Sequence, residues 1–213
     1  MGIRDEVAAL KRERTIDAAV QLFYERGFEK TTLEAVGERL GVTKPFIYAH
    51  FSSKAELLAE ICSRGIASAL KAIDSVLPLE RTPTEKIRLL GRRFVTSVLE
   101  NQMHIAIFTR EEKNLAPEDF ERINAMRRDF DHKLRSLLIQ GMEAGEFKVS
   151  DPRLAALGIG GMVSWAYVWF RPEGRLSIEE IADGLSAMIL AMVEAQPAGT
   201  TMPKAARRTA KKV

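Results

Sequence analysis

Residues 27–54 read GFEKTTLEAVGERLGVTKPFIYAHFSSK, and this stretch decides how the N-terminal part of the chain folds. Apolar spacing predicts a short helix that ends at Leu40 and a second one that begins after Thr43. A short turn that contains Gly41 lets the second helix cross the first, as in a helix-turn-helix unit. We expect a small apolar core to fix the crossing, and its members are Ala35, Val36, Leu40, Val42 and Ile47.

The second helix carries polar and aromatic side chains on the side that faces away from that core. These side chains are Thr43, Lys44, Pro45, Phe46 and Tyr48. Hydroxyls and an ammonium bond phosphate oxygens and acceptors on base edges, and an apolar ring contacts a thymine methyl. The sequence therefore predicts a recognition helix for the major groove of DNA, with Lys44 as the foremost candidate for a base contact.

The same stretch resembles the N-terminal signature of TetR-family regulators, over about residues 12–60. The matching motifs are Gly27-Phe28 before Thr31-Thr32, Gly41-Val42, Ile47-Tyr48 before His50-Phe51, and Ser53-Lys54 before Glu56-Leu57. The resemblance implies a homodimer whose two recognition helices enter successive major grooves of a palindromic operator.

The resemblance also implies roles for individual positions. The base-reading positions of the family match Thr43, Lys44, Pro45 and Phe46, and we expect Phe46 to press on a thymine methyl. The phosphate-binding positions match Thr32, Tyr48, His50 and Lys54. Thr32 and Lys54 stand at helix N-termini, where free backbone N–H groups favour an anion. A lone Tyr or His is more often structural, and Thr43 caps its helix in either case.

Helical periodicity and helix-start signals continue along almost the whole chain. Capping boxes are expected at Thr31–Glu34, Ser53–Glu56 and Thr82–Glu85, and Asp151-Pro152 is expected to open a helix that reaches Phe170. No alternation typical of strands with hairpin turns is visible. We predict an all-α fold of eight to ten helices. Its parts are a three-helix DNA-binding head over 1–54, a larger ligand-binding and dimerisation body over 55–196, and a basic, disordered tail over 197–213.

Composition excludes several other classes of protein. The 213 residues are 46% hydrophobic and 29% charged, which is typical of a folded globular chain. The N-terminus has no apolar leader, so the expected location is the cytoplasm. The single cysteine, Cys62, and three scattered histidines form no metal-ligand pattern, and no metal or cofactor is expected. No Gly-rich phosphate loop, G-x-S-x-G motif or triad-like set is present, so an enzyme is not expected.

The net charge of +3 says little about DNA binding, because it arises in the tail. Residues 197–213 carry five Lys and Arg side chains and no acid, so the rest of the chain is net acidic. The tail adds non-specific affinity for phosphate or only aids solubility, and the sequence leaves both readings open.

Large apolar side chains near the end of the predicted 151–170 helix indicate where a ligand binds. Trp165 and Trp169 share a helix face, and His104 and Phe108 do so on an earlier helix. Rings and methionines with a few polar atoms suit a pocket for a long apolar molecule. The candidate ligand-binding residues are His104, Phe108, Met162, Trp165, Trp169 and Arg171. The alternative is that these rings form core or dimer interface.

The block Trp169-Phe170-Arg171-Pro172-Glu173-Gly174-Arg175-Leu176-Ser177 resembles one in TetR-type regulators of fatty-acid and sterol breakdown. That resemblance implies an acyl-CoA thioester as the effector. Trp165, Trp169, His104 and Phe108 would then line the acyl chamber. The candidates for contact with CoA phosphates are Arg110, Arg127, Arg128 and Arg171.

The last two helices are expected to form the homodimer. The apolar stripe that predicts this contact is Ile178, Ile181, Leu185, Met188, Ile189 and Met192. The sequence thus predicts a DNA-binding transcriptional regulator, a repressor, that a small apolar ligand releases from its operator. The alternative is a ligand-independent architectural protein or activator that binds DNA without a sensor.

Overall fold

The computed structural model describes residues 2–194, and every regular element among them is helical. The elements are α1 (Ile3–Arg26), α2 (Leu33–Leu40), α3 (Lys44–Tyr48), α4 (Lys54–Asp74), α5 (Pro83–Glu100), α6 (Gln102–Glu111), the 3₁₀ turn η1 (Glu112–Asn114), α7 (Pro117–Glu143), α8 (Pro152–Ser164), α9 (Ala166–Trp169) and α10 (Ile178–Glu194). The predicted all-α fold is confirmed. The expected tail over 197–213 lies outside the described residues.

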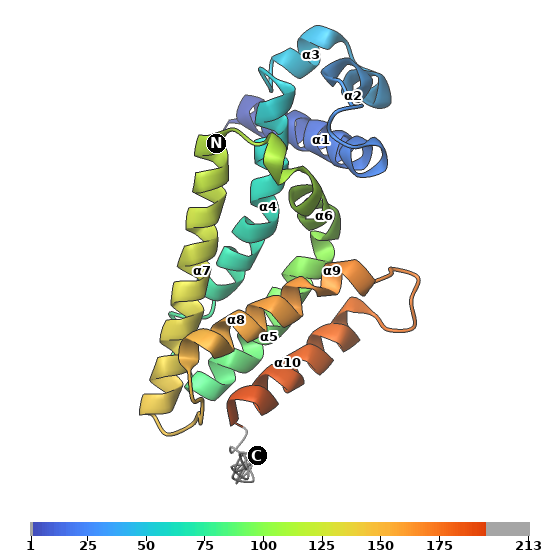
Figure 1. The fold of residues 1–213 in the computed structure, drawn as a ribbon. Coiled ribbons are helices and arrows are strands. Elements are labelled where there is room, and N and C mark those ends of the chain that lie inside the picture. Colours follow the sequence, from blue (N-terminus) through green and yellow to red (C-terminus); the bar gives the residue numbers. More distant parts are fainter. Residues whose placement is uncertain (1, 195–213) are drawn as a thin grey trace, which may run out of the picture.

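Helices α1, α2 and α3 gather at one end of the molecule, and α4 leads from them into a larger helical body (Figure 1). The buried side chains of this end include Ile16, Phe23, Val36 and Ile47. The same cluster extends along α4 as far as Cys62 and takes in Ile107, Phe108 and Ile123 of the body. We call α1–α3 and the first two turns of α4 the head. Its core is continuous with buried side chains of α6 and α7.

The capping signals marked the helix starts, but Thr43 accepts no side-chain cap hydrogen bond at α3, and the cap of α2 is shifted by one residue. Thr82 and Glu85 form the expected reciprocal capping box, and Ser53 accepts a hydrogen bond from the backbone N–H of Glu56. At α2 the cap is Thr32, whose side chain accepts from the Ala35 N–H. The neighbouring Thr31 is buried and donates to carbonyls of the α1 end instead. The predicted Thr31–Glu34 box was therefore wrong by one residue.

The body is built on a close contact between α5 and α10. A Cβ atom placed on Gly91 would lie 2.9 Å from Ser186 Oγ and 3.1 Å from Ser186 Cα, so these two helices approach almost backbone to backbone. Ser186 Oγ donates to the Arg88 carbonyl across the contact, at 2.8 Å. Phe94, Phe130, Leu137 and other buried side chains fill the space toward α7 and α8.

The helix predicted from Asp151 to Phe170 is two helices. Asp151 caps its start as expected, by accepting from the N–H groups of Arg153 and Leu154. The helix is interrupted at Trp165, and α9 continues for a single turn that ends at Trp169. Gln102 bonds the Tyr167 and Phe170 carbonyls, at 2.8 and 3.1 Å, and so ties this end to α6. In the part of the chain that the structure describes, no helix is long and apolar enough to cross a membrane.

Candidate DNA-binding surface and ligand cavity

The two short helices of the head cross closely because glycine stands at the contact. A Cβ atom on Gly37 would lie 3.3 Å from the Val42 carbonyl and 3.4 Å from Ile47 Cγ1, so a larger residue would force α3 away from α2. Gly41 has φ +67°, a left-handed conformation that ends α2 and favours glycine. Ile47 is fully buried beneath the crossing. The recognition helix is therefore held by its inner face, and its outer face is left free.

Five of the eight predicted DNA-binding residues are exposed on this outer face or beside it. They are Thr32, Thr43, Lys44, Pro45 and Tyr48. Tyr48 keeps 44% of its surface exposed, which is high for a large ring. Free backbone N–H groups at the starts of α2 and α3 lie next to Thr32 and Thr43. Such a surface offers hydroxyls, an ammonium and helix N-termini to phosphates and base edges.

Lys44 has an internal partner when no DNA is present. Its ammonium lies 2.6 Å from Glu34 Oε1 and 5.3 Å from the centre of the Tyr48 ring. The hydrogen bond with Glu34 raises the pKa of Lys44 above its ordinary value, and the same bond lowers the pKa of Glu34. Both side chains are exposed, so the pair is easily exchanged for a contact with DNA.

The side chains at the remaining three positions are less accessible for contact with DNA than the sequence implied. Lys54 points inward, where its ammonium donates to the Phe28 carbonyl at 2.8 Å and lies 4.2 Å from the centre of the Phe28 ring. It links the start of α4 to the α1–α2 loop. Phe46 and His50 are half-buried, and their rings meet edge to face at 5.4 Å. Phe46 packs against the head core, which leaves less of the ring free for a thymine methyl.

The first turns of α1 also belong to this surface, and the motif-based reasoning missed them. Ile3, Arg4, Val7, Ala8 and Lys11 form a groove with Phe46, Ala49 and His50 of the recognition helix region. The Lys11 ammonium lies 5.5 Å from the centre of the Phe46 ring. These turns lie before the family motif and carry no net charge, since Asp5 and Glu6 balance Arg4 and Lys11, so no clear signal for them is visible in the sequence.

The body contains a partly open cavity of about 350 Å³ lined by residues of six helices, which we call the central cavity. Its apolar walls come from Ile66, Ala69, Phe94, Val98, Ile105 and Phe130, and its polar groups from Thr109, Arg127, Asp131, Ser164 and Tyr167. Gly65, Gly160 and Gly161 provide room along α4 and α8. A mostly apolar chamber with a few polar groups is typical of a small-molecule site.

None of the six predicted ligand-binding residues lines the central cavity. Phe108 is buried in the head core, under the Arg127 guanidinium at 4.2 Å from its ring centre. Met162 packs against the body core, and Arg171 donates to the Val168 and Phe170 carbonyls of its own loop. The cavity is lined by other residues of α6, α8 and α9.

The two tryptophans are on the surface of this chain. Trp165 is 62% exposed and Trp169 is 46% exposed. Ser164 and Tyr167, which do line the cavity, lie beside them in the sequence; Tyr167 is half-buried, and Ser164 is at the exposed edge of α8. The sequence reasoning placed the largest rings inside, because it could not tell a core-facing stripe from an exposed one.

His104 of α6 lies near charged side chains of α1 and α4 and does not line the cavity. Its Nε2 atom is buried and is without a hydrogen-bond partner in residues 2–194. Burial lowers the pKa of the imidazole, and the nearby Arg64 lowers it further, while Asp17 and Glu13 oppose this effect. Arg64 is itself held by both oxygens of Glu13, at 2.6 and 2.8 Å, and so links α4 to α1.

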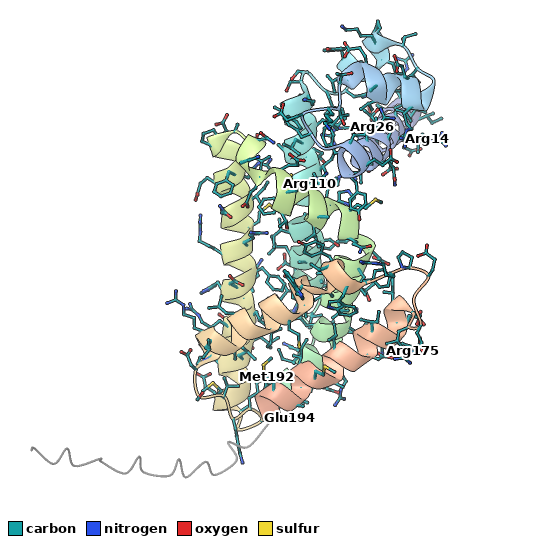
Figure 2. All side chains as sticks on the ribbon, turned by 45° about the vertical axis from the view of Figure 1, so that its right-hand side comes forward. Arg14, Arg26, Arg110, Arg175, Met192 and Glu194 are labelled. Atoms are coloured by element: carbon teal, nitrogen blue, oxygen red, sulfur yellow. The ribbon has the colours of Figure 1, made fainter. Side chains whose placement is uncertain are left out.

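The end of α6 is fastened to the head by two side chains. The Arg110 guanidinium donates to the Phe23 and Tyr24 carbonyls at the end of α1. Glu111 is only 6% exposed and accepts from the Phe28 N–H at 3.2 Å. Arg110 Nε and Asn114 Nδ2 also donate hydrogen bonds to this carboxylate. Figure 2 shows Arg110 at the junction of head and body, so α6 has contacts with the cavity and with the head.

No group of three or more His, Cys, Asp or Glu side chains in residues 2–194 could hold a metal ion. Cys62 is buried, and burial, together with Glu111 and Glu112, raises its pKa to about 12, so the thiol stays protonated.

A helix-turn-helix head with an exposed second helix, carried on a helical body with an apolar chamber, defines a DNA-binding transcriptional regulator. Residues 16–61 match the model of bacterial regulatory proteins of the tetR family, and residues 80–193 match the tetracyclin repressor-like C-terminal domain. The chain therefore belongs to the TetR family of transcriptional regulators.

Individual relatives agree with this assignment. The chain is 23% identical to the transcriptional repressor KstR2 of Mycolicibacterium smegmatis over 185 residues, which cover 85% of this chain and 90% of that protein. It is 26% identical to the fatty acid metabolism regulator protein of Bacillus subtilis over 156 residues, which cover 72% and 79%.

Solved structures of regulators also superpose on the chain. The TetR-family regulator PfmR of Thermus thermophilus gives a TM-score of 0.76 at 31% identity, with 83% of this chain and 97% of that chain covered. AibR in complex with isovaleryl coenzyme A and operator DNA gives a TM-score of 0.71 at 28% identity, with 84% and 97% covered.

Proposed function

We propose that this TetR-family regulator binds a palindromic operator as a homodimer and is released from it when a small apolar effector, an acyl-CoA thioester, enters the central cavity. One observation carries the proposal: α4 and α6 line the cavity and also contribute buried side chains to the head core. Ile105 of α6 lies against Gly65 of α4 at the cavity wall. Within a single turn, Ile107 and Phe108 of α6 are part of the head core.

A ligand in the cavity can move the head because these contacts leave little slack. A Cβ atom on Gly65 would lie 2.9 Å from Ile105 Cγ1, so α4 and α6 already touch at the wall. A ligand that displaces Ile105 shifts α6, and Arg110 and Glu111 transmit the shift to the end of α1. Two recognition helices whose separation has changed no longer meet both half-sites, and DNA affinity falls. By linkage, operator binding must weaken ligand binding equally.

The dimer contact is assigned to the exposed apolar faces of α8 and α10. Leu154 and Trp165 of α8 are 66% and 62% exposed, and Met188 of α10 is 58% exposed. Such a patch favours burial against an identical patch on a second copy. Of the predicted stripe, Ile181 and Ile189 face the core of this chain instead, while Met188 and Met192 stay exposed.

The effector class is supported by the size of the cavity and by the relatives. About 350 Å³ is at the small end of the range of ligand pockets, roughly 300–1,000 Å³, and favours a short or medium acyl group. The fatty acid metabolism regulator and the AibR complex with isovaleryl coenzyme A are regulators whose names refer to acyl chemistry.

Filling the cavity tests this proposal directly. A Cβ atom on Gly160 meets no atom within 4 Å, so a larger side chain there extends into free space. We expect Gly160→Leu to bind operator DNA like the wild type but to resist release by octanoyl-CoA, with Gly160→Ala as the small-volume control. Normal release of the leucine variant would show that the effector does not use this cavity.

A further inference from the structure

A second hollow adjoins the central cavity along the seam between α7 and α8, and we call it the arginine groove. It has a volume of about 370 Å³. Its lining residues are Arg128, Asp131, His132, Arg135, Arg153, Ala156 and Leu157. Asp131 and Leu157 line both hollows, so the groove and the cavity share a wall.

The groove gathers cationic side chains from two helices. Arg128, Asp131, His132 and Arg135 follow one another at i, i+3, i+4 and i+7, which places them on one face of α7. Arg153 comes from the first turn of α8. The side chains that line the groove thus include three guanidinium groups and a single carboxylate, that of Asp131.

Two of these arginines have no acidic partner in the described part of the chain. Arg128 pairs with Glu121, but neither Arg135 nor Arg153 lies within 4.0 Å of a carboxylate oxygen in residues 2–194. Arg135 Nη2 instead approaches His132 Nδ1 at 3.3 Å. The cation of the opposite side of α7, Lys133, is paired with both Asp74 and Asp129. On α7, the cations without a carboxylate oxygen within 4.0 Å in residues 2–194 are Arg135, in the groove, and Arg127, which lines the adjoining central cavity.

We infer that the arginine groove binds the phosphorylated end of an effector whose apolar end occupies the central cavity, with Arg135 and Arg153 as its main phosphate contacts. The inference rests on the proposed function and specifies the chemistry of the same site. Guanidinium groups match phosphate oxygens with paired hydrogen bonds, and three such groups beside the single lining carboxylate of Asp131 favour an anion. A free fatty acid offers the groove a single carboxylate charge, whereas an acyl-CoA or a prenyl diphosphate offers several phosphate charges beyond the end of its apolar chain.

The test compares ligands that share an apolar chain but differ in phosphate. Calorimetric titration of the full-length wild type with octanoyl-CoA, octanoate and geranyl diphosphate measures how much the phosphates add to the binding affinity. We expect octanoyl-CoA to bind at least tenfold more tightly than octanoate, with an affinity that falls as salt rises. The double variant Arg135→Gln, Arg153→Gln should lose at least tenfold in octanoyl-CoA affinity, flatten the salt dependence and leave octanoate binding unchanged.

Two controls separate charge from structure. Arg81→Gln, Arg175→Gln removes two exposed arginines that line neither hollow and should bind octanoyl-CoA normally. Arg135→Lys, Arg153→Lys keeps the charges and should retain part of the affinity. Equal binding of octanoyl-CoA by the wild type and the glutamine variant overturns the groove but leaves the effector proposal standing.

The remaining outcomes also separate the two proposals. Tight, arginine-dependent binding of geranyl diphosphate alone supports the groove and overturns the CoA ester as effector. If the wild type binds octanoate and octanoyl-CoA equally, the groove does not bind phosphate, and the proposal that the cavity binds the apolar chain is left standing. A wild type that binds none of the three ligands overturns both proposals.

Discussion

Lys44 is the exposed cation at the start of the recognition helix, and its place beside Glu34 decides how it acts. Because the pair is on the surface, exchanging Glu34 for a base or phosphate acceptor costs little. We predict that Lys44→Ala weakens operator binding about tenfold, the loss of one base or phosphate contact. Glu34→Gln, which frees the ammonium, should strengthen binding slightly.

The measurement is a fluorescence-anisotropy titration of labelled operator with each variant. Tyr48→Phe removes a second exposed donor and serves as a comparison at a neighbouring position. Unchanged affinity in the alanine variant would mean that Lys44 does not touch DNA.

His104 gives the fold a defined pH dependence. Because burial and Arg64 lower the pKa of His104 in the folded state, the unfolded chain binds a proton more readily. The resulting stability is present above the unfolded pKa of about 6.5 and is lost as the pH falls below it. We predict that His104→Gln loses less free energy of unfolding than the wild type between about pH 7 and about pH 5.5.

Denaturant unfolding at one fixed protein concentration checks this at each pH. Glu13 and Glu60, whose pKa values are lowered by hydrogen bonds with Arg64 and Arg12, lose their contribution only below about 4.5 and do not interfere. Parallel pH curves for wild type and variant would contradict the assignment.

At the scale of the helix, α6 is the element that joins cavity and head. Arg110→Ala removes the hydrogen bonds to the Phe23 and Tyr24 carbonyls but leaves the cavity walls intact. We predict that this variant still binds effector and operator, while the effector reduces its DNA affinity several-fold less than it does for the wild type. Operator titrations with and without saturating octanoyl-CoA measure the coupling, and an unchanged ratio would rule out the Arg110 link.

The sequence predicted the helices well and their buried faces less well. Caps such as Thr82–Glu85 act within one turn, so they are visible locally. Which face of α8 points inward depends on packing against α7 and α10, and no local pattern distinguishes Trp165 outside from Val163 inside. The recognition helix was located because its motif combines several short-range signals. The inward turn of Lys54 depends on the Phe28 carbonyl, which is 26 residues distant.

At the scale of the whole molecule, DNA binding should depend on a second copy of the chain. Charging the exposed face of α8 and α10 with Trp165→Glu and Met188→Glu should give a folded monomer, since both side chains are on the surface. A monomer presents one recognition helix, so specific operator affinity should fall by orders of magnitude. Sedimentation analysis with operator titration checks this, and a dimer with normal affinity would place the interface elsewhere.

The central claim is that an acyl-CoA thioester controls operator binding by this chain. The most direct measurement is a gel-shift titration with the DNA upstream of its own gene, to which short, long and ring-containing acyl-CoA esters are added. We expect a tight complex that one class of ester dissociates and that free CoA leaves intact. A complex that no ester affects would contradict it, and the chain would remain a TetR-family regulator with an effector of another class.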